Sequence, residues 1–168
     1  MSSKVTKVIR LSRSACRKSV TQPKEAWLLL RMAWWVSVLS AAAKLCPLPR
    51  ALEIVSGRGN PNTRDFDPDL PARLARSMDT LLSVGLLHFT PVCWKRAAVL
   101  RRYLSRNGIA TMIQFGVRAD QVGKVDGHAW LELDGKPFLE TAPAEYVVTY
   151  SFPSEKSYRA EEALLSSD

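Results

Sequence analysis

Cys93 and His128 are the two residues of the sequence whose side chains together fit a thiol hydrolase. Such an enzyme needs a thiolate, a base for its proton, a group that orients the base, and donors for an oxyanion. Thr90 and Pro91 suit the N-cap and the first position of a helix, which places Cys93 in its first turn. Free N–H groups and the helix dipole there favour a thiolate and can bind an oxyanion. Taken alone, such a cysteine is more often an inert residue on a buried stripe, so the interpretation depends on its pairing with His128.

Two acids downstream of His128 are candidates to orient its ring, Glu140 and Asp134. Asp134 and Gly135 form a hairpin turn signal between a strand that begins at His128 and a strand that begins at residue 136. A carboxylate at the tip of such a turn is usually solvated, which favours Glu140. Asp134 remains the alternative.

The length of the hairpin loop decides which face of the sheet carries Glu140. A two-residue turn puts Glu140 on the face opposite to His128, whereas a three-residue loop puts it directly across from His128. We prefer the three-residue loop because it separates site residues from core residues, with Trp130 and Phe138 on the His128 face. The residues that this register predicts on the core-facing side are Ala129, Leu131, Leu133 and Leu139.

The elements that would position these residues run from helices to strands. This order predicts an α+β fold in which the Cys-bearing helix packs on a small antiparallel sheet. Pro23 opens the first helix, and the segment 46–49, with its two prolines, ends it. Gly108 ends the helix of Cys93. The predicted helices span residues 23–43, 69–82 and 91–107, and the predicted strands span residues 109–118, 128–133, 136–140 and 147–152.

The helix of Cys93 has a two-sided pattern. Apolar and small side chains recur at helical spacing on the side that is predicted to face the core, and this side also carries Cys93. Four basic side chains are predicted on the solvent side. The inward set is Cys93, Ala97, Leu100 and Leu104, and the outward set is Lys95, Arg101, Arg102 and Arg106.

The excess positive charge of the chain lies in its first third. Residues 1–50 carry ten Lys or Arg residues and one acid, whereas the other residues are close to neutral. A basic arm over residues 1–22 attracts an acidic peptide or an anionic membrane surface, and the plainer alternative is a solvated tail. Nucleic acid is not expected, because no zinc-ligand spacing or helix-turn-helix signal accompanies the charge. The apolar segment 26–43 contains Arg31 and is expected to pack in a core or to lie on a membrane surface.

The cysteines indicate the compartment. Cys16, Cys46 and Cys93 are widely spaced and odd in number, which argues against a disulfide framework and for a reducing, cytoplasmic location. Neither of the two histidines lies near enough to a cysteine pair to suggest a structural zinc site. We therefore expect no metal and no cofactor.

The sequence resembles the leader peptidases of lasso-peptide biosynthesis, which are transglutaminase-like cysteine proteases, in the segments PVCWKRAAVLRRYLSRNGI, QFGVRAD, GHAWLELDGKPFLE and YSFP. The resemblance covers roughly residues 24–152. It implies that Cys93 is the nucleophile, His128 the base, and Glu140 the orienting acid, a position where many members have Asp. It also implies a small winged-helix leader-recognition protein, which is sometimes fused, as a separate partner. This chain resembles the stand-alone protease, acting beside an asparagine-synthetase-like cyclase.

Together these features predict a cysteine endopeptidase that removes the leader from a ribosomally made precursor peptide. Its domain is expected to span residues 23–152, with a helical part to residue 85, a catalytic part from residue 86, and a tail over residues 153–168. The first helix and the basic arm would bind the recognition protein, the leader or a membrane. Two alternatives stay open: an amidase or acyltransferase with the same triad, and an inert basic scaffold.

Overall fold

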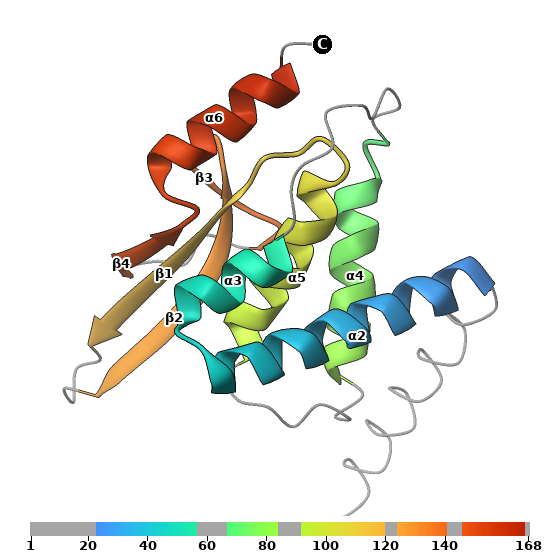
Figure 1. The fold of residues 1–168 in the computed structure, drawn as a ribbon, viewed down its shortest axis with the longest axis horizontal. Helices are drawn as coiled ribbons and strands as arrows, with labels where there is room; N and C mark the ends of the chain where they lie inside the picture. Colours follow the sequence, from blue (N-terminus) through green and yellow to red (C-terminus); the bar gives the residue numbers. More distant parts are fainter. Residues whose placement is uncertain (1–22, 57–66, 84–91, 120–123, 141–145, 167–168) are drawn as a thin grey trace, which may run out of the picture.

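The computed structural model describes residues 23–56, 67–83, 92–119, 124–140 and 146–166, and the predicted α+β fold is confirmed in them (Figure 1). The described residues form five helices and one antiparallel sheet of four strands, in the order β3-β2-β1-β4. The helices are α2 (Pro23–Leu45), α3 (Leu48–Ser56), α4 (Leu70–Ser83), α5 (Val92–Ser105) and α6 (Glu155–Ser166). The strands are β1 (Met112–Ala119), β2 (Val125–Leu133), β3 (Lys136–Phe138) and β4 (Val147–Phe152).

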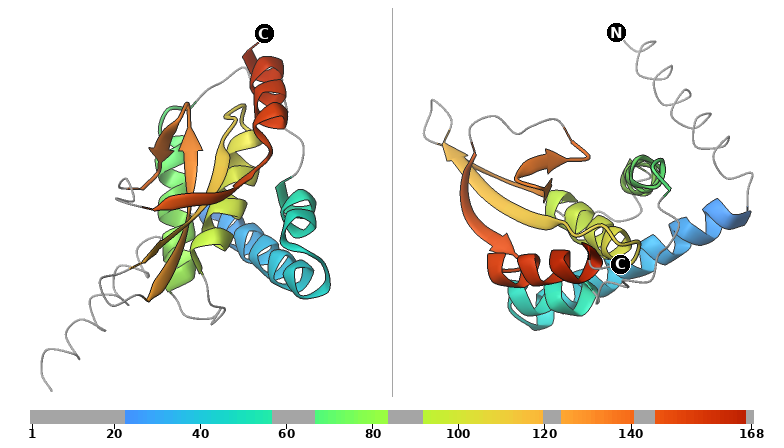
Figure 2. Two further views of the ribbon diagram at one scale, coloured as in Figure 1. Left: turned by 90° about the vertical axis from the view of Figure 1, so that its left-hand side faces the viewer. Right: turned by 90° about the horizontal axis from the view of Figure 1, so that it is seen from above.

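Helix α5, which carries Cys93, lies at the centre of the fold. It packs on β1 and β2 on one side and on α2, α3 and α4 on the other, as Figures 1 and 2 show. Its predicted inward stripe is confirmed, because Ala97, Leu100 and Leu104 are buried and Cys93 is half-buried. The helix ends as predicted at Gly108, whose φ of 78° allows the N–H of the next residue to reach back to the carbonyl of Leu104 at 3.0 Å. The predicted N-cap residues lie outside the described part of the chain.

The prediction that the basic residues of α5 face solvent is wrong for three of the four. Helices cover α5 on the side away from the sheet, so a helix that looks two-sided in sequence has almost no solvent face. Long basic side chains can nevertheless be buried when their charged ends find partners. The buried residues are Lys95, Arg101 and Arg102, whereas Arg106 is exposed.

Arg102 shows how such a residue is accommodated. Its Nη1 donates to the carbonyl of Val55 in α3 at 2.7 Å, and its guanidinium lies 3.5 Å from the centre of the Trp35 ring of α2. Burial lowers the pKa of Arg102, and the charge of Arg106 acts in the same direction. The residue therefore joins three helices rather than facing water.

Two helices lie where none was predicted. The prolines after α2 predict a helix stop, yet Pro49 occupies the first turn of α3, where a missing N–H costs no helical hydrogen bond. Helix α3 then buries Ala51, Leu52 and Val55. The second unpredicted helix is α6, which lies in the segment that was interpreted as a tail, and its Tyr158 packs with Ala110 and Met112.

Helix α2 has one buried and one exposed apolar side. Its buried residues Met32, Val36 and Leu39 belong to the main core, whereas Trp27 and Trp34 are exposed. Residues Glu25–Leu45 are long and apolar enough to cross a membrane. Length and composition alone are weak evidence for crossing, because the core helix of a soluble protein passes the same test.

Candidate active site

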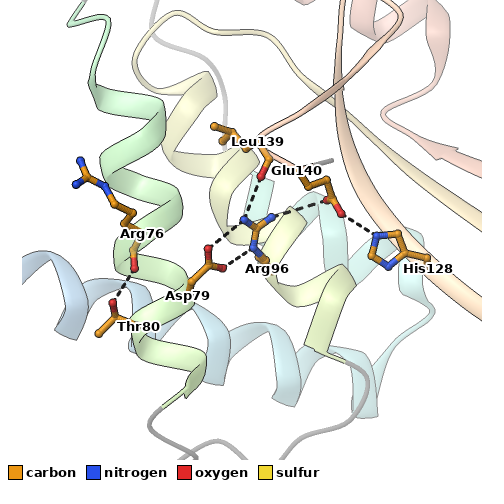
Figure 3. Close-up of polar contacts among 7 residues, drawn as sticks. All are labelled: Arg76, Asp79, Thr80, Arg96, His128, Leu139 and Glu140. Carbon is orange, nitrogen blue, oxygen red and sulfur yellow. Dashed lines mark hydrogen bonds and ion pairs between the residues drawn. The ribbon is translucent and has the colours of Figure 1, made fainter. Parts of the chain in front are cut away.

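His128 and Glu140 are in direct contact. The Nε2 of His128 lies 2.8 Å from Oε2 of Glu140, and the two side chains are 27% and 21% exposed (Figure 3). A carboxylate can only accept at this distance, so Nε2 carries the proton that is donated to Glu140. Nδ1 is then the nitrogen left with a lone pair, and a base needs such a nitrogen. The sequence predicts that His128 begins its strand. Strand β2 in fact begins at Val125, so His128 lies inside the strand.

The register that was preferred for the hairpin is wrong, although the contact it was meant to explain exists. Strands β2 and β3 pair Leu133 with Lys136, which leaves the two-residue turn Asp134-Gly135 with φ values of 51° and 74°. Two left-handed residues make the turn whose twist matches that of the flanking strands. This register places Phe138 opposite Leu131, and Phe138 accordingly packs against the core and not on the His128 face. The core-facing placement of Ala129, Leu131, Leu133 and Leu139 is confirmed.

The backbone conformation of Leu139 brings Glu140 to the face of the sheet that carries His128. If the ladder continued, Glu140 would lie opposite Ala129, whose side chain is on the other face from His128. Strand β3 instead ends at Phe138, and Leu139 has a φ of 63°. A non-glycine residue in this region costs about 1–3 kcal/mol, and such strain is concentrated at functional sites. The contact between Glu140 and His128 therefore depends on one strained residue and not on strand pairing.

The ring of His128 is enclosed by aromatic side chains. Trp130 stacks on it with ring centres 6.0 Å apart and planes 14° apart, and the Tyr146 ring lies 5.5 Å away at 41°. Gly116, the partner of His128 in β1, provides the space for the Trp130 ring and for the Cβ of Tyr146. A Cβ on Gly116 would lie 2.9 Å from a Trp130 ring carbon and 2.9 Å from the Cβ of Tyr146.

Replacing Gly116 by alanine is therefore expected to displace Trp130 or Tyr146 and to destabilise the protein by about 1–3 kcal/mol, as overpacked sites do. Urea unfolding followed by tryptophan fluorescence measures the change. Gly127→Ala is the matched control, because the nearest atom to its added Cβ is 4.0 Å away. Equal stability of the two variants would contradict the close packing at Gly116.

Tyr146 links His128 to charged groups and to the nucleophile candidate. Its hydroxyl donates to Oδ2 of Asp126 at 2.7 Å, and this hydrogen bond lowers the pKa of Asp126 and raises the pKa of Tyr146. The thiolate charge of Cys93 adds a smaller contribution that raises the pKa of Tyr146 further. Arg118 lies 4.9 Å above the Tyr146 ring and pairs with Asp126 at 3.3 Å.

Cys93 lies in the first turn of α5, as the described part of the helix begins at Val92. Its thiol is free and half-buried. A thiolate at this position would lie close enough to raise the pKa of Tyr146, whose ring also contacts the ring of His128. Among the described residues, Cys93 and His128 make no hydrogen bond with each other. The structure thus brings His128 and Glu140 together and places Cys93 within electrostatic range of the same aromatic group. In free enzymes such catalytic hydrogen bonds are often long and shorten only with substrate.

Two further residues of the site were not recognised in the sequence, Arg96 and Asp79. Arg96 of α5 pairs with Asp79 of α4 at 2.7 Å and with Glu140 at 3.8 Å, as Figure 3 shows. Arg96 follows Cys93 by one helical turn, which is a spacing that the sequence does reveal. Nothing in the sequence indicates Asp79, because its position depends on how α4 packs on α5. The alternative orienter Asp134 lies at the hairpin turn, and the carboxylate that contacts His128 is that of Glu140.

No group of three or more His, Cys, Asp or Glu side chains is placed to hold a metal ion within the residues that the structure describes. A family model described as the Transglutaminase-like superfamily matches residues 26–151. No curated protein and no solved structure matches the chain. The matched segment begins inside α2 and ends inside β4, so it contains Cys93, His128 and Glu140.

Proposed function

Because the chain belongs to the transglutaminase-like superfamily, we propose that it is a cysteine endopeptidase whose catalytic triad is Cys93, His128 and Glu140. The observation that carries this proposal is the contact of 2.8 Å between Nε2 of His128 and Glu140. A carboxylate on one imidazole nitrogen holds the ring in a single tautomer and stabilises its cation, as the acid of a triad does. Members of the superfamily are typically cysteine proteases or acyltransferases, which agrees with this chemistry.

The proposed reaction proceeds through a thioester. Nδ1 of His128 takes the proton of the Cys93 thiol, and Sγ attacks the carbonyl carbon of the scissile amide. Backbone N–H groups at the start of α5 hold the oxyanion. His128 then gives its proton to the leaving amine, which departs with the C-terminal part of the substrate. A water molecule loses a proton to His128 and attacks the thioester, which releases the carboxylate product and the thiol.

The proposed substrate is a ribosomally made precursor peptide, cut between its leader and its core, as in lasso-peptide maturation. The proposed partners are a small winged-helix leader-recognition protein and an asparagine-synthetase-like cyclase. The proposed location is the cytoplasm, with the basic arm and α2 in contact with the recognition protein, the leader or an anionic membrane surface. The exposed side of α2, with Trp27, Leu30 and Trp34, supports such a contact.

The proposal is tested by incubating the purified chain with a leader-bearing precursor peptide and a winged-helix leader-recognition protein, and by measuring product masses. We expect a free leader carboxylate that carries one ¹⁸O atom when the reaction runs in H₂¹⁸O, and no product from Cys93→Ala. Cys46→Ser is the matched control, because Cys46 directly follows α2 and its thiol donates to the carbonyl of Ala42 in the last turn of that helix.

The same experiment separates the alternatives. A product that gains the mass of an added amine in place of water identifies an acyltransferase, in which an amine attacks the thioester of Cys93. Absence of any product with the partner present, together with precursor processing in cells that is indifferent to Cys93→Ala, would show that the chain is an inert scaffold.

A further inference from the structure

Arg96 of α5 contacts two other segments of the chain beside the proposed triad, α4 and the residues that follow β3. It lies on α5 one turn after Cys93, and its side chain is 18% exposed. Its Nε donates to Oδ1 of Asp79 at 2.7 Å, and its Nη2 donates to the carbonyl of Leu139 at 3.3 Å. Its Nη1 lies 3.8 Å from Oε1 of Glu140. Figure 3 shows the resulting line of contacts from α4 through Arg96 and Glu140 to His128.

Arg96 contacts residues 139 and 140 at the turn of the backbone that brings Glu140 to His128. Leu139 has the strained φ of 63° that turns Glu140 away from the face where continued pairing with β2 would place it. The guanidinium holds the carbonyl of this residue and attracts the carboxylate of the next one. Arginine suits this position, since its donors form a rigid planar fork that can bind several acceptors at once.

We propose that Arg96 is a positioning residue of the site: it holds Leu139 and Glu140 in the turned conformation and thereby fixes the tautomer of His128. This inference rests on the proposed function. Because Arg96 and Cys93 lie on the same helix, the contact also ties the carboxylate to the element that carries the nucleophile. Asp79 fixes the guanidinium from the opposite side, through a carboxylate that is 56% exposed.

A simple surface ion pair would not explain this arrangement. The pair of Arg96 with Asp79 is partly solvated, and pairs of this kind contribute little to stability. The contacts toward Leu139 and Glu140 lie on the more buried side, where the carboxylate is only 21% exposed. Loss of Arg96 is therefore expected to change the tautomer balance of His128 more than it changes the free energy of unfolding.

The first measurement is the ¹⁵N NMR spectrum of the imidazoles in the free protein at a pH where they are neutral. The chain has two histidines, and a His128→Gln sample identifies the signals of His128. In the parent protein we expect the form with the proton on Nε2. In Arg96→Met the two neutral tautomers of His128 are expected to mix. The same mixing is expected in Glu140→Ala, and an intermediate spectrum is expected in Arg96→Lys.

Arg76→Met is the matched control. Arg76 lies on α4, and its Nε donates to the carbonyl of Ala72 in its own helix. We expect the His128 spectrum of this variant to equal that of the parent. An unchanged spectrum in both Arg96→Met and Arg96→Lys would overturn the proposal. If Arg96→Met does not fold, Arg96→Lys and Asp79→Asn carry the same test, and parent spectra in both would overturn it.

The second measurement is a double-mutant cycle on the alkylation rate of Cys93. Arg96→Met is expected to slow alkylation by about 10- to 100-fold, since small misplacements in a site cost up to about 10²-fold. In a Glu140→Ala background the same change is expected to have less than about a twofold effect, because Arg96 acts through Glu140. Equal effects in both backgrounds would overturn the proposal.

The two measurements separate this inference from the proposed function. If Cys93 is not an activated thiol, the alkylation of the parent is slow and indifferent to His128, and the proposed function fails. The His128 spectrum still responds to Arg96 in that case if the positioning is as described. A fast, His128-dependent alkylation together with a spectrum indifferent to Arg96 would leave the function standing and overturn the inference alone.

Discussion

Alkylation of Cys93 is expected to be fast and to persist well below about pH 8, where an ordinary thiol becomes slow, and His128→Ala is expected to abolish this behaviour. The physical reason is that an imidazolium ion beside the sulfur stabilises the thiolate. The rate is measured with iodoacetamide against pH, in a background where Cys16 and Cys46 are serines. His128→Ala is also expected to lower the rate of precursor cleavage by about 10⁴-fold or more, as for other triads that lose their histidine.

The acid that orients His128 is tested in the same assay. Glu140→Ala is expected to lower cleavage by about 10²- to 10⁴-fold, which is less than the loss of the base itself. Asp134→Asn is the matched control, because this carboxylate lies at the exposed hairpin turn and asparagine tolerates its φ of 51°. A large loss in Asp134→Asn with little change in Glu140→Ala would reverse the assignment. A Cys93 rate that follows an ordinary thiol, whatever the residue at position 128, would exclude the triad.

The second large effect concerns stability. Glu161→Ala is expected to destabilise the protein by about 3 kcal/mol, because it leaves the buried guanidinium of Arg101 without its ionic partner, with only the Thr111 carbonyl accepting from its Nε. Arg101 is 3% exposed and its Nη2 pairs with Glu161 of α6, whose other carboxylate oxygen accepts from Ser105. Burial lowers the pKa of Arg101, and the charge of Glu161 partly offsets this effect. We place the value at the low end of the range for buried pairs, since Glu161 is 19% exposed.

Urea unfolding at neutral pH measures this change, which corresponds to a decrease in Tm of about 6–12 °C for a domain of this size. Glu155→Ala is the matched control on the same helix. Its pair with Arg159 is 72–73% exposed, so we expect a change below about 0.5 kcal/mol. If both variants lose less than about 0.5 kcal/mol of stability, the ion pair of Arg101 does not anchor α6 to α5. The C-terminal helix is then held by its apolar contacts.

Much of the fold follows from local sequence features. The order of helices before strands, the buried stripe of α5 and its stop at Gly108 depend on periodicity and on one glycine, and these operate within a few residues. The helices α3 and α6 are not predicted, because the prolines near α3 resemble a helix stop and the segment of α6 resembles a tail. Pro49 is compatible with a first helical turn, and α6 is stabilised by its contacts with α5 and β1.

The residue types of the site and their approximate places can be inferred from local sequence features: a cysteine at a helix start, a histidine in a strand, and a glutamate after a hairpin. How Glu140 reaches His128 depends instead on tertiary contacts. Pairing in the observed register would have placed Glu140 on the wrong face, and the reversal depends on a strained Leu139 that is held by Arg96. Strain of this kind persists only where contacts from distant segments compensate for it, and such contacts leave no period or spacing in the sequence.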